Sequence, residues 1–114
     1  MLAVDLATGD RSVLPNPSPG LLLEPRAIAL HAAADRVLVT NSIVNGLLAI
    51  DLETGEGRTL ADGDGDIGVP LIAPVDAVVD AARNRLLVLD VTTGAVVAFN
   101  IAPGAPADRA VLSR

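Results

Sequence analysis

Three carboxylates at alternate positions are the most evident candidates for chemistry in this sequence. Asp62, Asp64 and Asp66 are separated by single glycines. Oxygen ligands at positions 1, 3 and 5 of a short loop suit Ca²⁺, which prefers hard oxygen donors. Positions 6 and 12 of such a loop would be Ile67 and Ala73, where calcium loops have Gly and Glu. We therefore interpret the segment mainly as a solvated connection, and calcium is the one cofactor that the sequence suggests.

Two further oxygen-bearing side chains, Asn41 and Asp90, occupy equivalent positions 49 residues apart, each at the end of a predicted strand. Such residues can coordinate a metal ion or bind a substrate, and they also hydrogen-bond the backbone of their own loop. We favour the structural interpretation. Both residues remain candidates for a ligand-binding face.

No complete catalytic set is present. His31 is the only histidine, and it falls at a predicted turn, where we interpret it as a surface residue. Ser42 has no histidine on the same predicted face to activate it, so no Ser-His-Asp triad can be proposed. No glycine-rich phosphate loop follows a strand and opens a helix.

Composition argues against several classes of partner. The chain has eight arginines, no lysine and a net charge of −6, whereas nucleic-acid binding requires clustered cations. No apolar run approaches the roughly 18 residues of a membrane span, and the first residues lack the features of a signal peptide. Because there is no cysteine, the compartment stays undetermined. We expect no nucleic acid and no membrane as partners.

An internal repeat positions the candidate residues. Residues 25–39 recur as residues 74–88, which gives a period of 49, and the same offset carries residues 48–52 onto residues 97–101. A third, partial copy at residues 4–11 opens the chain in mid-repeat. A period of this size indicates a repeat architecture in which each unit packs on its neighbours.

Each period contains four runs typical of short strands. In the first full copy they are residues 28–30, 37–40, 47–52 and 58–61, rich in aliphatic residues and bounded by Gly, Pro, Asn or Asp. The first three are apolar on both faces, so we expect them to be sandwiched between neighbouring sheets. The fourth mixes polar and apolar residues and is expected at the rim.

The turns between these strands have their own signals. Asp35 and Asn84 precede the second strand and tolerate a left-handed backbone, and Gly55 can supply a positive φ between the third and fourth strands. Both hairpins are expected on one face of the molecule. The linkers and the loops that follow Asn41 and Asp90 are expected on the opposite face.

Four short strands per period are the signature of a propeller blade. The chain resembles the six-bladed propellers of the NHL-repeat and gluconolactonase-like, senescence-marker-like families. The resemblance rests on the Pro-x-x-Ile-x-Leu opening at residues 25–30, on Asx-Arg-x-Leu-Val-x-Asx at 35–41 and 84–90, and on Asp-Leu-x-Thr-Gly at 51–55. It implies an all-β fold, a β-propeller fragment of about two and a half four-stranded antiparallel blades.

We expect a single partial propeller domain over residues 1–114. A six-bladed ring at this period would need roughly 290 residues, so missing blades or other copies of the chain are expected to complete it. The predicted segments are a half blade of third and fourth strands at 1–14, full blades at 25–61 and 74–113, and inter-blade linkers at 15–24 and 62–73.

The predicted function is that of a non-catalytic propeller segment that binds a protein or a small ligand on the linker face. The alternative is a fragment of a metal-dependent gluconolactonase-like hydrolase, in which a divalent metal polarises a lactone carbonyl. The resemblance would then make Asn41 and Asp90 the contributions of this chain. Lactonases often carry an Asn-Asp pair after the opening proline of a blade, where this chain has Arg26-Ala27 and Val75-Asp76.

Overall fold

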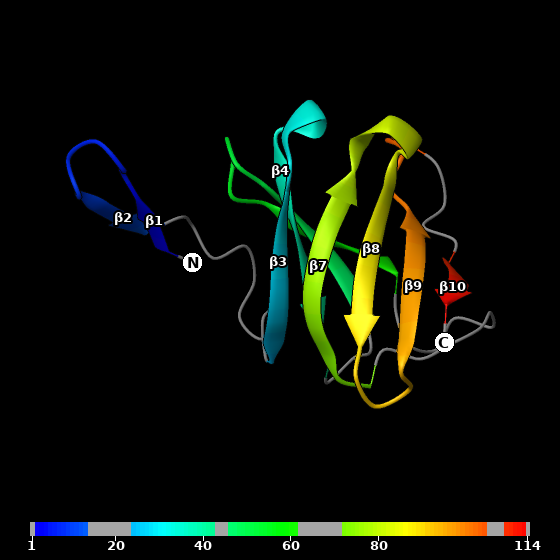
Figure 1. Cartoon of the computed structure of the whole chain (residues 1–114). Helices are drawn as coiled ribbons and strands as arrows, with labels where there is room; N and C mark the ends of the chain where they lie inside the picture. Colours follow the sequence, from blue (N-terminus) through cyan, green and yellow to red (C-terminus); the bar gives the residue numbers. More distant parts are fainter. Residues whose placement is uncertain (1, 14–23, 43–45, 62–71, 105–108, 114) are drawn as a thin grey trace.

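The computed structural model describes residues 2–13, 24–42, 46–61, 72–104 and 109–113, which form ten β-strands and two single-turn 3₁₀ helices (Figure 1). All strand pairings are antiparallel, so the prediction of an all-β chain built from antiparallel four-stranded sheets is confirmed. Within these residues no helix is long and apolar enough to cross a membrane.

Three sheets follow one another along the chain, each formed by strands that are neighbours in sequence. A hairpin of two short strands comes first, and two four-stranded meanders follow, each with a 3₁₀ turn after its first strand. The elements are β1 (Leu2–Val4) and β2 (Arg11–Val13); β3 (Pro25–His31), η1 (Ala32–Ala34), β4 (Arg36–Asn41), β5 (Gly46–Asp51) and β6 (Gly57–Ala61); and β7 (Pro74–Asp80), η2 (Ala81–Arg83), β8 (Arg85–Asp90), β9 (Ala95–Asn100) and β10 (Arg109–Ser113).

The turn residues adopt the backbone conformations that their types predict. Asp35 and Asn84 are the only described residues other than glycine with a positive φ, at 49° and 47°. Gly55 has φ 75°. The turn before Gly55 is held by Asp51, whose Oδ1 accepts the backbone N–H groups of Glu53 and Thr54 at 2.8 and 2.9 Å. These turn conformations reverse the chain, so that the strands on either side of each turn pair in antiparallel orientation.

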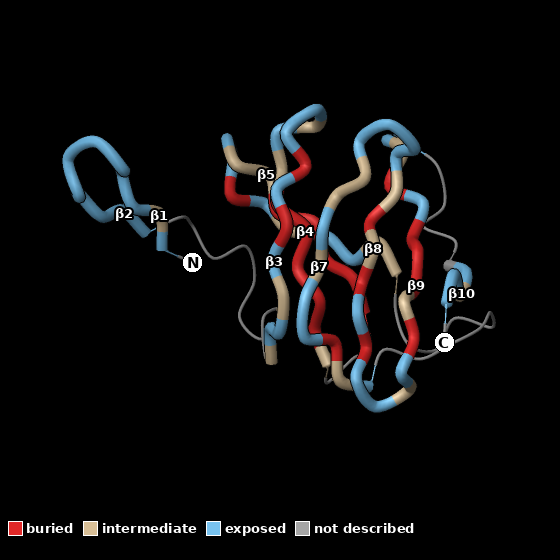
Figure 2. The backbone as a smooth tube through the Cα atoms, in the orientation of Figure 1, coloured by how far each residue is buried: buried red, intermediate tan, exposed pale blue. Residues whose placement is uncertain are grey.

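The two four-stranded sheets pack face to face and are in close contact along their first strands, β3 and β7, which lie side by side (Figure 1). Side chains from both sheets form one apolar cluster between them, and Figure 2 shows the buried stretches along β4, β8 and β9. Fully burying a Leu, Val, Ile or Phe side chain contributes about 1.5–3 kcal/mol, so the seven such residues of this cluster stabilise the contact between the sheets. Its buried members are Ala29, Leu38, Leu47 and Ala49 from the first sheet, and Leu86, Val88, Ala95, Val97, Phe99 and Ile101 from the second sheet and the residue after β9.

Register shows that the two sheets use opposite faces for this contact. Ala29 pairs with Leu38 on the interface face of the first sheet. The repeat carries Ala29 onto Val78, whereas the interface face of the second sheet holds its neighbours, Ala77 and Val79. Successive strand residues point to opposite faces, so each sheet has one face with the position of Ala29 and Val78, and an opposite face with the positions of Ala77 and Val79. The stacking therefore joins one face of a repeat to the other face of the next.

The first strands differ from the prediction. Residues of β3 and β7 were expected to be covered on both faces, yet Ile28, Leu30 and Val78 are 56%, 58% and 60% exposed. The expectation is correct for β4 and β5, where almost every residue is buried. The exposure is not confined to the first strands, because Leu89 of the central strand β8 is 44% exposed as well. The physical reason is that these residues lie on outer faces of the sheets, away from the apolar cluster between them.

Candidate functional site

Asp90 is a structural residue at the linker end of the second sheet. Its carboxylate is fully buried and accepts five hydrogen bonds. Oδ2 accepts the backbone N–H groups of Ile72 and Ala73 at 2.7 and 3.0 Å. Oδ1 accepts those of Thr92 and Thr93, both at 3.1 Å, and the Thr93 hydroxyl at 3.3 Å. This confirms the expectation that Asp90 bonds its own loop, and adds the linker as a second partner.

These contacts keep the Asp90 carboxylate ionised. Burial raises the pKa of an acid, but hydrogen bonds from the backbone N–H groups of Thr93, Ala73 and Ile72 and from the Thr93 hydroxyl outweigh it, and the pKa of Asp90 is lowered. Both oxygens are already engaged by donors of the chain. The arrangement is that of a clamp between the linker and the loop after β8.

Asn41 holds the matching place in the first sheet. It ends β4 and is fully buried. The backbone around it repeats the pattern at Asp90, since the Ser42 N–H donates to the Glu24 carbonyl at 3.2 Å as the Val91 N–H donates to Ala73 at 3.1 Å. Burial of Asn41 follows from its place between β3 and β5, where it pairs with Pro25 and Gly46.

The calcium candidates Asp62, Asp64 and Asp66 lie outside the described residues. Among the residues that the structure does describe, no group of three His, Asp or Glu side chains is placed to hold a metal ion.

A polar group that the sequence did not indicate links Ser42, the residue after β4, to the start of β3. The Ser42 hydroxyl donates to Glu24 Oε2 at 2.6 Å, and Arg26 donates to Glu24 Oε1 at 2.8 Å and to the Ser42 hydroxyl oxygen at 3.3 Å. Ser42 therefore has a carboxylate partner although no histidine faces it. The group fastens the start of β3 to Ser42.

His31 does not lie at the surface, so this prediction is wrong. It is the last residue of β3 and only 3% exposed. Its Nδ1 accepts a hydrogen bond from Arg36 Nε at 3.1 Å, and Arg36 in turn donates to the Ile101 carbonyl of the second sheet at 2.9 Å. Burial, and then the charge of Arg36, lower the pKa of His31 below its usual 6.5. The ring is therefore neutral, with its proton on Nε2.

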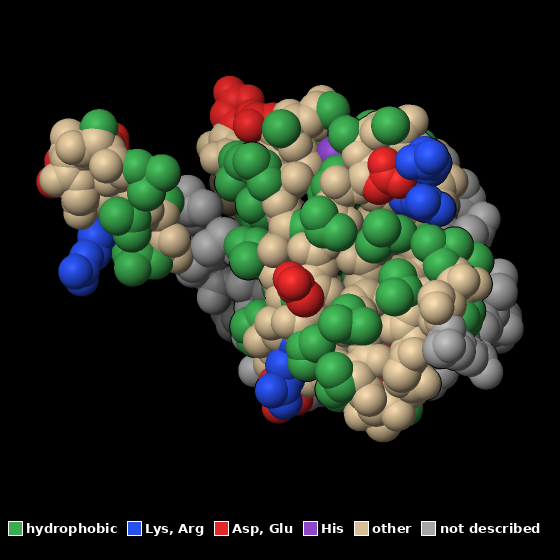
Figure 3. Space-filling view, viewed as in Figure 1, with side chains coloured by type: hydrophobic (Ala, Val, Ile, Leu, Met, Phe, Trp, Pro, Cys, Tyr) green, Lys and Arg blue, Asp and Glu red, His purple; other side chains and the backbone are tan. Residues whose placement is uncertain are grey.

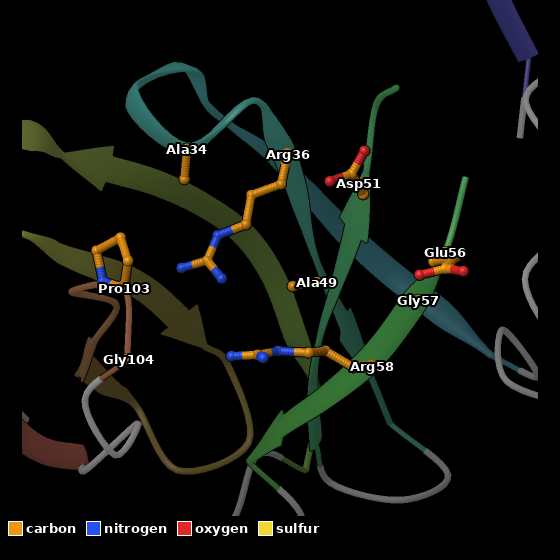
Figure 4. A pocket seen from close by; sticks show the side chains of 9 residues that line it. All are labelled: Ala34, Arg36, Ala49, Asp51, Glu56, Gly57, Arg58, Pro103 and Gly104. Carbon is orange, nitrogen blue, oxygen red and sulfur yellow. The ribbon is translucent and has the colours of Figure 1, made fainter. Parts of the chain in front are cut away.

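A pocket of about 370 Å³ opens at Arg36, the partner of this histidine, between the first sheet and the turn that follows β9 (Figure 4). Figure 4 shows the guanidinium groups of Arg36 and Arg58 pointing into it toward the segment of Pro103 and Gly104. Burial, and then the charge of Arg58, lower the pKa of Arg36 from its usual value. Small residues form the walls: Ala34, Ala49, Gly57, Pro103 and Gly104.

Neither a known protein family nor a curated protein was found to match the sequence. Function is therefore inferred from the geometry of the chain itself. The one sequence signal for the Arg36 and Arg58 pocket is a break in the repeat, because His31 stands where the second copy has Asp80.

Proposed function

We propose that the chain is a non-catalytic binding segment of a β-propeller, in which the two four-stranded sheets are neighbouring blades. The observation that carries the proposal is the stacking of two copies of one repeat through opposite faces, with their first strands in close contact. Blades radiating from a common axis have this arrangement, with the first strand of each blade innermost.

An exposed apolar surface supports a further partner at these first strands. Hydrophobic side chains gather over β3, β7 and β8 (Figure 3). Val75 and Val78 are 50% and 60% exposed, and Leu89 on the neighbouring strand is 44% exposed. Scattered apolar residues on a surface are ordinary, but a gathered patch of large ones marks an interaction site.

The repeat identifies what fits this surface. Within the chain, Ala29 packs in one cluster with Ala77 and Val79. In the repeat, Val78 is the counterpart of Ala29, and Ile28 and Leu30 are the counterparts of Ala77 and Val79. The same contact made between two copies of the chain would therefore place Val78 of one copy against Ile28 and Leu30 of another. Ile28 and Leu30 are exposed as well. We therefore propose that a second copy of the chain docks the exposed first strand of its first sheet, at Ile28 and Leu30, on the outer face of the second sheet. The rest of that face of the first sheet, along β4 and β5, is already buried within the chain.

Such a contact is heterologous, because one face of a copy meets a different face of the next. Heterologous contacts generate rings when the rotation closes. Stacking of this kind accords with a propeller completed between chains, and it would bury the apolar surface on both partners.

The mass of the purified chain in solution tests the proposal, with circular dichroism to follow β structure. We expect a discrete folded oligomer, and we expect Val78→Asp to reduce its mass because a buried unpaired charge is costly. Val13→Asp is the matched control, since Val13 is 76% exposed on the separate β1–β2 hairpin. A folded monomer for the unsubstituted chain, or equal loss of mass in both variants, would contradict the proposal.

The non-catalytic part of the proposal is supported by the engagement of the Asp90 oxygens in five hydrogen bonds. Its test is hydrolysis of simple lactones by the oligomer, with and without added calcium or zinc. We expect no hydrolysis above the buffer rate. Metal-dependent turnover would overturn this part and favour the gluconolactonase-like alternative.

A further inference from the structure

Two equivalent arginines, one in each sheet, have different partners at the hairpin ends of the sheets. In the second sheet, Arg85 Nε donates to Asp80 Oδ2 at 2.8 Å, an ion pair that neutralises the arginine. The repeat places Arg36 and His31 at the same two positions of the first sheet. Arg36 Nε donates to His31 Nδ1 at 3.1 Å with the same bonding atom. The arginine Nε–H thus donates to the equivalent residue in both sheets, but the first sheet lacks the carboxylate that neutralises the arginine.

Arg36 therefore keeps an uncompensated positive charge. A ring nitrogen that accepts a hydrogen bond belongs to a neutral imidazole, so His31 contributes no charge of either sign. Arg36 has five N–H donors, of which two serve His31 and the Ile101 carbonyl. Within the described part of the chain, no carboxylate lies within ion-pair distance of Arg36.

Arg58 adds a second cation to the same space. Ala49 pairs with Arg58 across β5 and β6, on the face that looks toward the second sheet. Both arginines line the pocket of about 370 Å³, and Figure 4 shows their guanidinium groups directed to the same side of it. The ion pairs of the described residues leave Arg58, like Arg36, without a carboxylate partner.

Two carboxylates also line the pocket, and they lie on its other side (Figure 4). Asp51 Oδ1 is bound to the backbone N–H groups of Glu53 and Thr54 in the turn after β5. Glu56 is exposed at the rim. Charge in the pocket is thus separated, with both cations near Pro103 and Gly104 and both anions toward the turn. This separation favours a small anionic group over an extended polyanion, which Asp51 and Glu56 would repel.

We propose that this pocket binds a small oxyanion, a phosphate or carboxylate group, between Arg36 and Arg58. The planar guanidinium group presents parallel N–H donors that match the oxygens of either group. The small wall residues leave room for the group and for the part of a ligand attached to it. The site is independent of the proposed blade contact, since it lies between the two sheets of one chain.

A second pocket supplies an internal comparison. It measures about 290 Å³, and four of the residues that line it, Arg83, Arg85, Ala98 and Asn100, are the repeat counterparts of Ala34, Arg36, Ala49 and Asp51 in the first pocket. There Arg85 is already paired with Asp80. The proposal therefore assigns oxyanion binding to the first pocket only.

The test is a titration of the isotope-labelled full chain with inorganic phosphate, followed by the NMR signals of the arginine Nε–H groups. We expect saturable shifts of the Arg36 and Arg58 signals and none of comparable size at Arg85. A parallel titration with acetate distinguishes the two sources of the oxyanion. Affinity should fall as salt is added, because the attraction is between charges.

Two substitutions test the assignment. His31→Asp restores the carboxylate that the second sheet has, and we expect it to weaken phosphate binding by about tenfold or more, the effect of losing one charge-assisted interaction. Arg58→Gln removes an exposed side chain and should weaken binding similarly without affecting the fold. Arg11→Gln, on the β1–β2 hairpin, is the matched control and should leave the affinity unchanged.

A third substitution has the opposite expected sign. Glu56→Gln removes a repelling charge at the rim, so phosphate should bind more tightly. The proposal is overturned if phosphate gives no saturable shift at tens of millimolar, or if binding is unaffected by Arg58→Gln. Since Arg58 is exposed and Arg58→Gln should fold, failure of His31→Asp to fold leaves this second criterion intact.

Discussion

The Asp90 carboxylate offers the sharpest test of how the second sheet is held to its linker. Asp90→Ala removes the acceptor of five hydrogen bonds at a fully buried position. Leaving buried donors without a partner costs about 1–3 kcal/mol per group, although water can reach some of them once the carboxylate is gone. We expect a loss of about 3–5 kcal/mol in the free energy of unfolding, comparable to breaking a buried charge pair.

This loss is large against the total stability of a domain, which is about 5–15 kcal/mol. Urea denaturation followed by circular dichroism, at one fixed protein concentration, measures it. Asp10→Ala is the matched control, because Asp10 is exposed in the turn of the β1–β2 hairpin, away from both four-stranded sheets. That variant should lie within about 0.5 kcal/mol of the unsubstituted chain.

Asp90→Asn removes the charge of the side chain and keeps its shape. An amide oxygen can replace one carboxylate oxygen, but the amide NH₂ then faces donors at the other, so an intermediate loss of about 1–3 kcal/mol is expected. A loss below about 1 kcal/mol for Asp90→Ala would refute the interpretation of Asp90 as a clamp.

Three further outcomes are expected. Phe99→Ala should cost about 3–5 kcal/mol in a urea titration, because Phe99 is fully buried between the sheets; a cost below about 1 kcal/mol would show that this interface is loose. His31 has a lowered pKa, so its stabilising contribution is complete above pH 6.5 and is lost as the pH falls from there toward the folded-state pKa. His31→Gln should flatten that part of the stability profile, and an unchanged profile would contradict the buried neutral ring. Gly104→Ala should destabilise by about 1–2 kcal/mol through its φ of 80° alone, because a Cβ there meets no atom within 4 Å; a neutral result would show that the turn can relax.

Much of the strand order could be predicted because the local signals agree with one another. The predicted runs 28–30, 37–40, 47–52 and 58–61 lie within or overlap β3 to β6. The left-handed positions were found because only a few residue types accept a positive φ. What differs is the extent of β3, which continues through His31 since its backbone, at φ −104° and ψ 79°, still pairs with Arg36.

The burial of His31 and the pocket at Arg36 could not be predicted from local pattern. The ring is bonded by Arg36, which is held by the Ile101 carbonyl 65 residues further along the chain. The second cation, Arg58, and the wall at Pro103 join the pocket only when the sheets stack. The only sequence feature that relates to this site is a difference between the two repeat copies, which have His31 and Asp80 at the equivalent position.

Cross-linking between copies tests most directly the claim that stacked blades are joined end to end. The chain has no cysteine, so single cysteines can be introduced without competing thiols. Val78→Cys and Ile28→Cys chains are prepared separately, mixed and oxidised. We predict that the mixture forms a disulfide between the two variants and that each variant alone does not. Disulfide-linked pairs of Val78→Cys alone would show a symmetric contact, and the absence of any cross-link in the mixture would show that the outer face receives no second copy; either result would contradict the account.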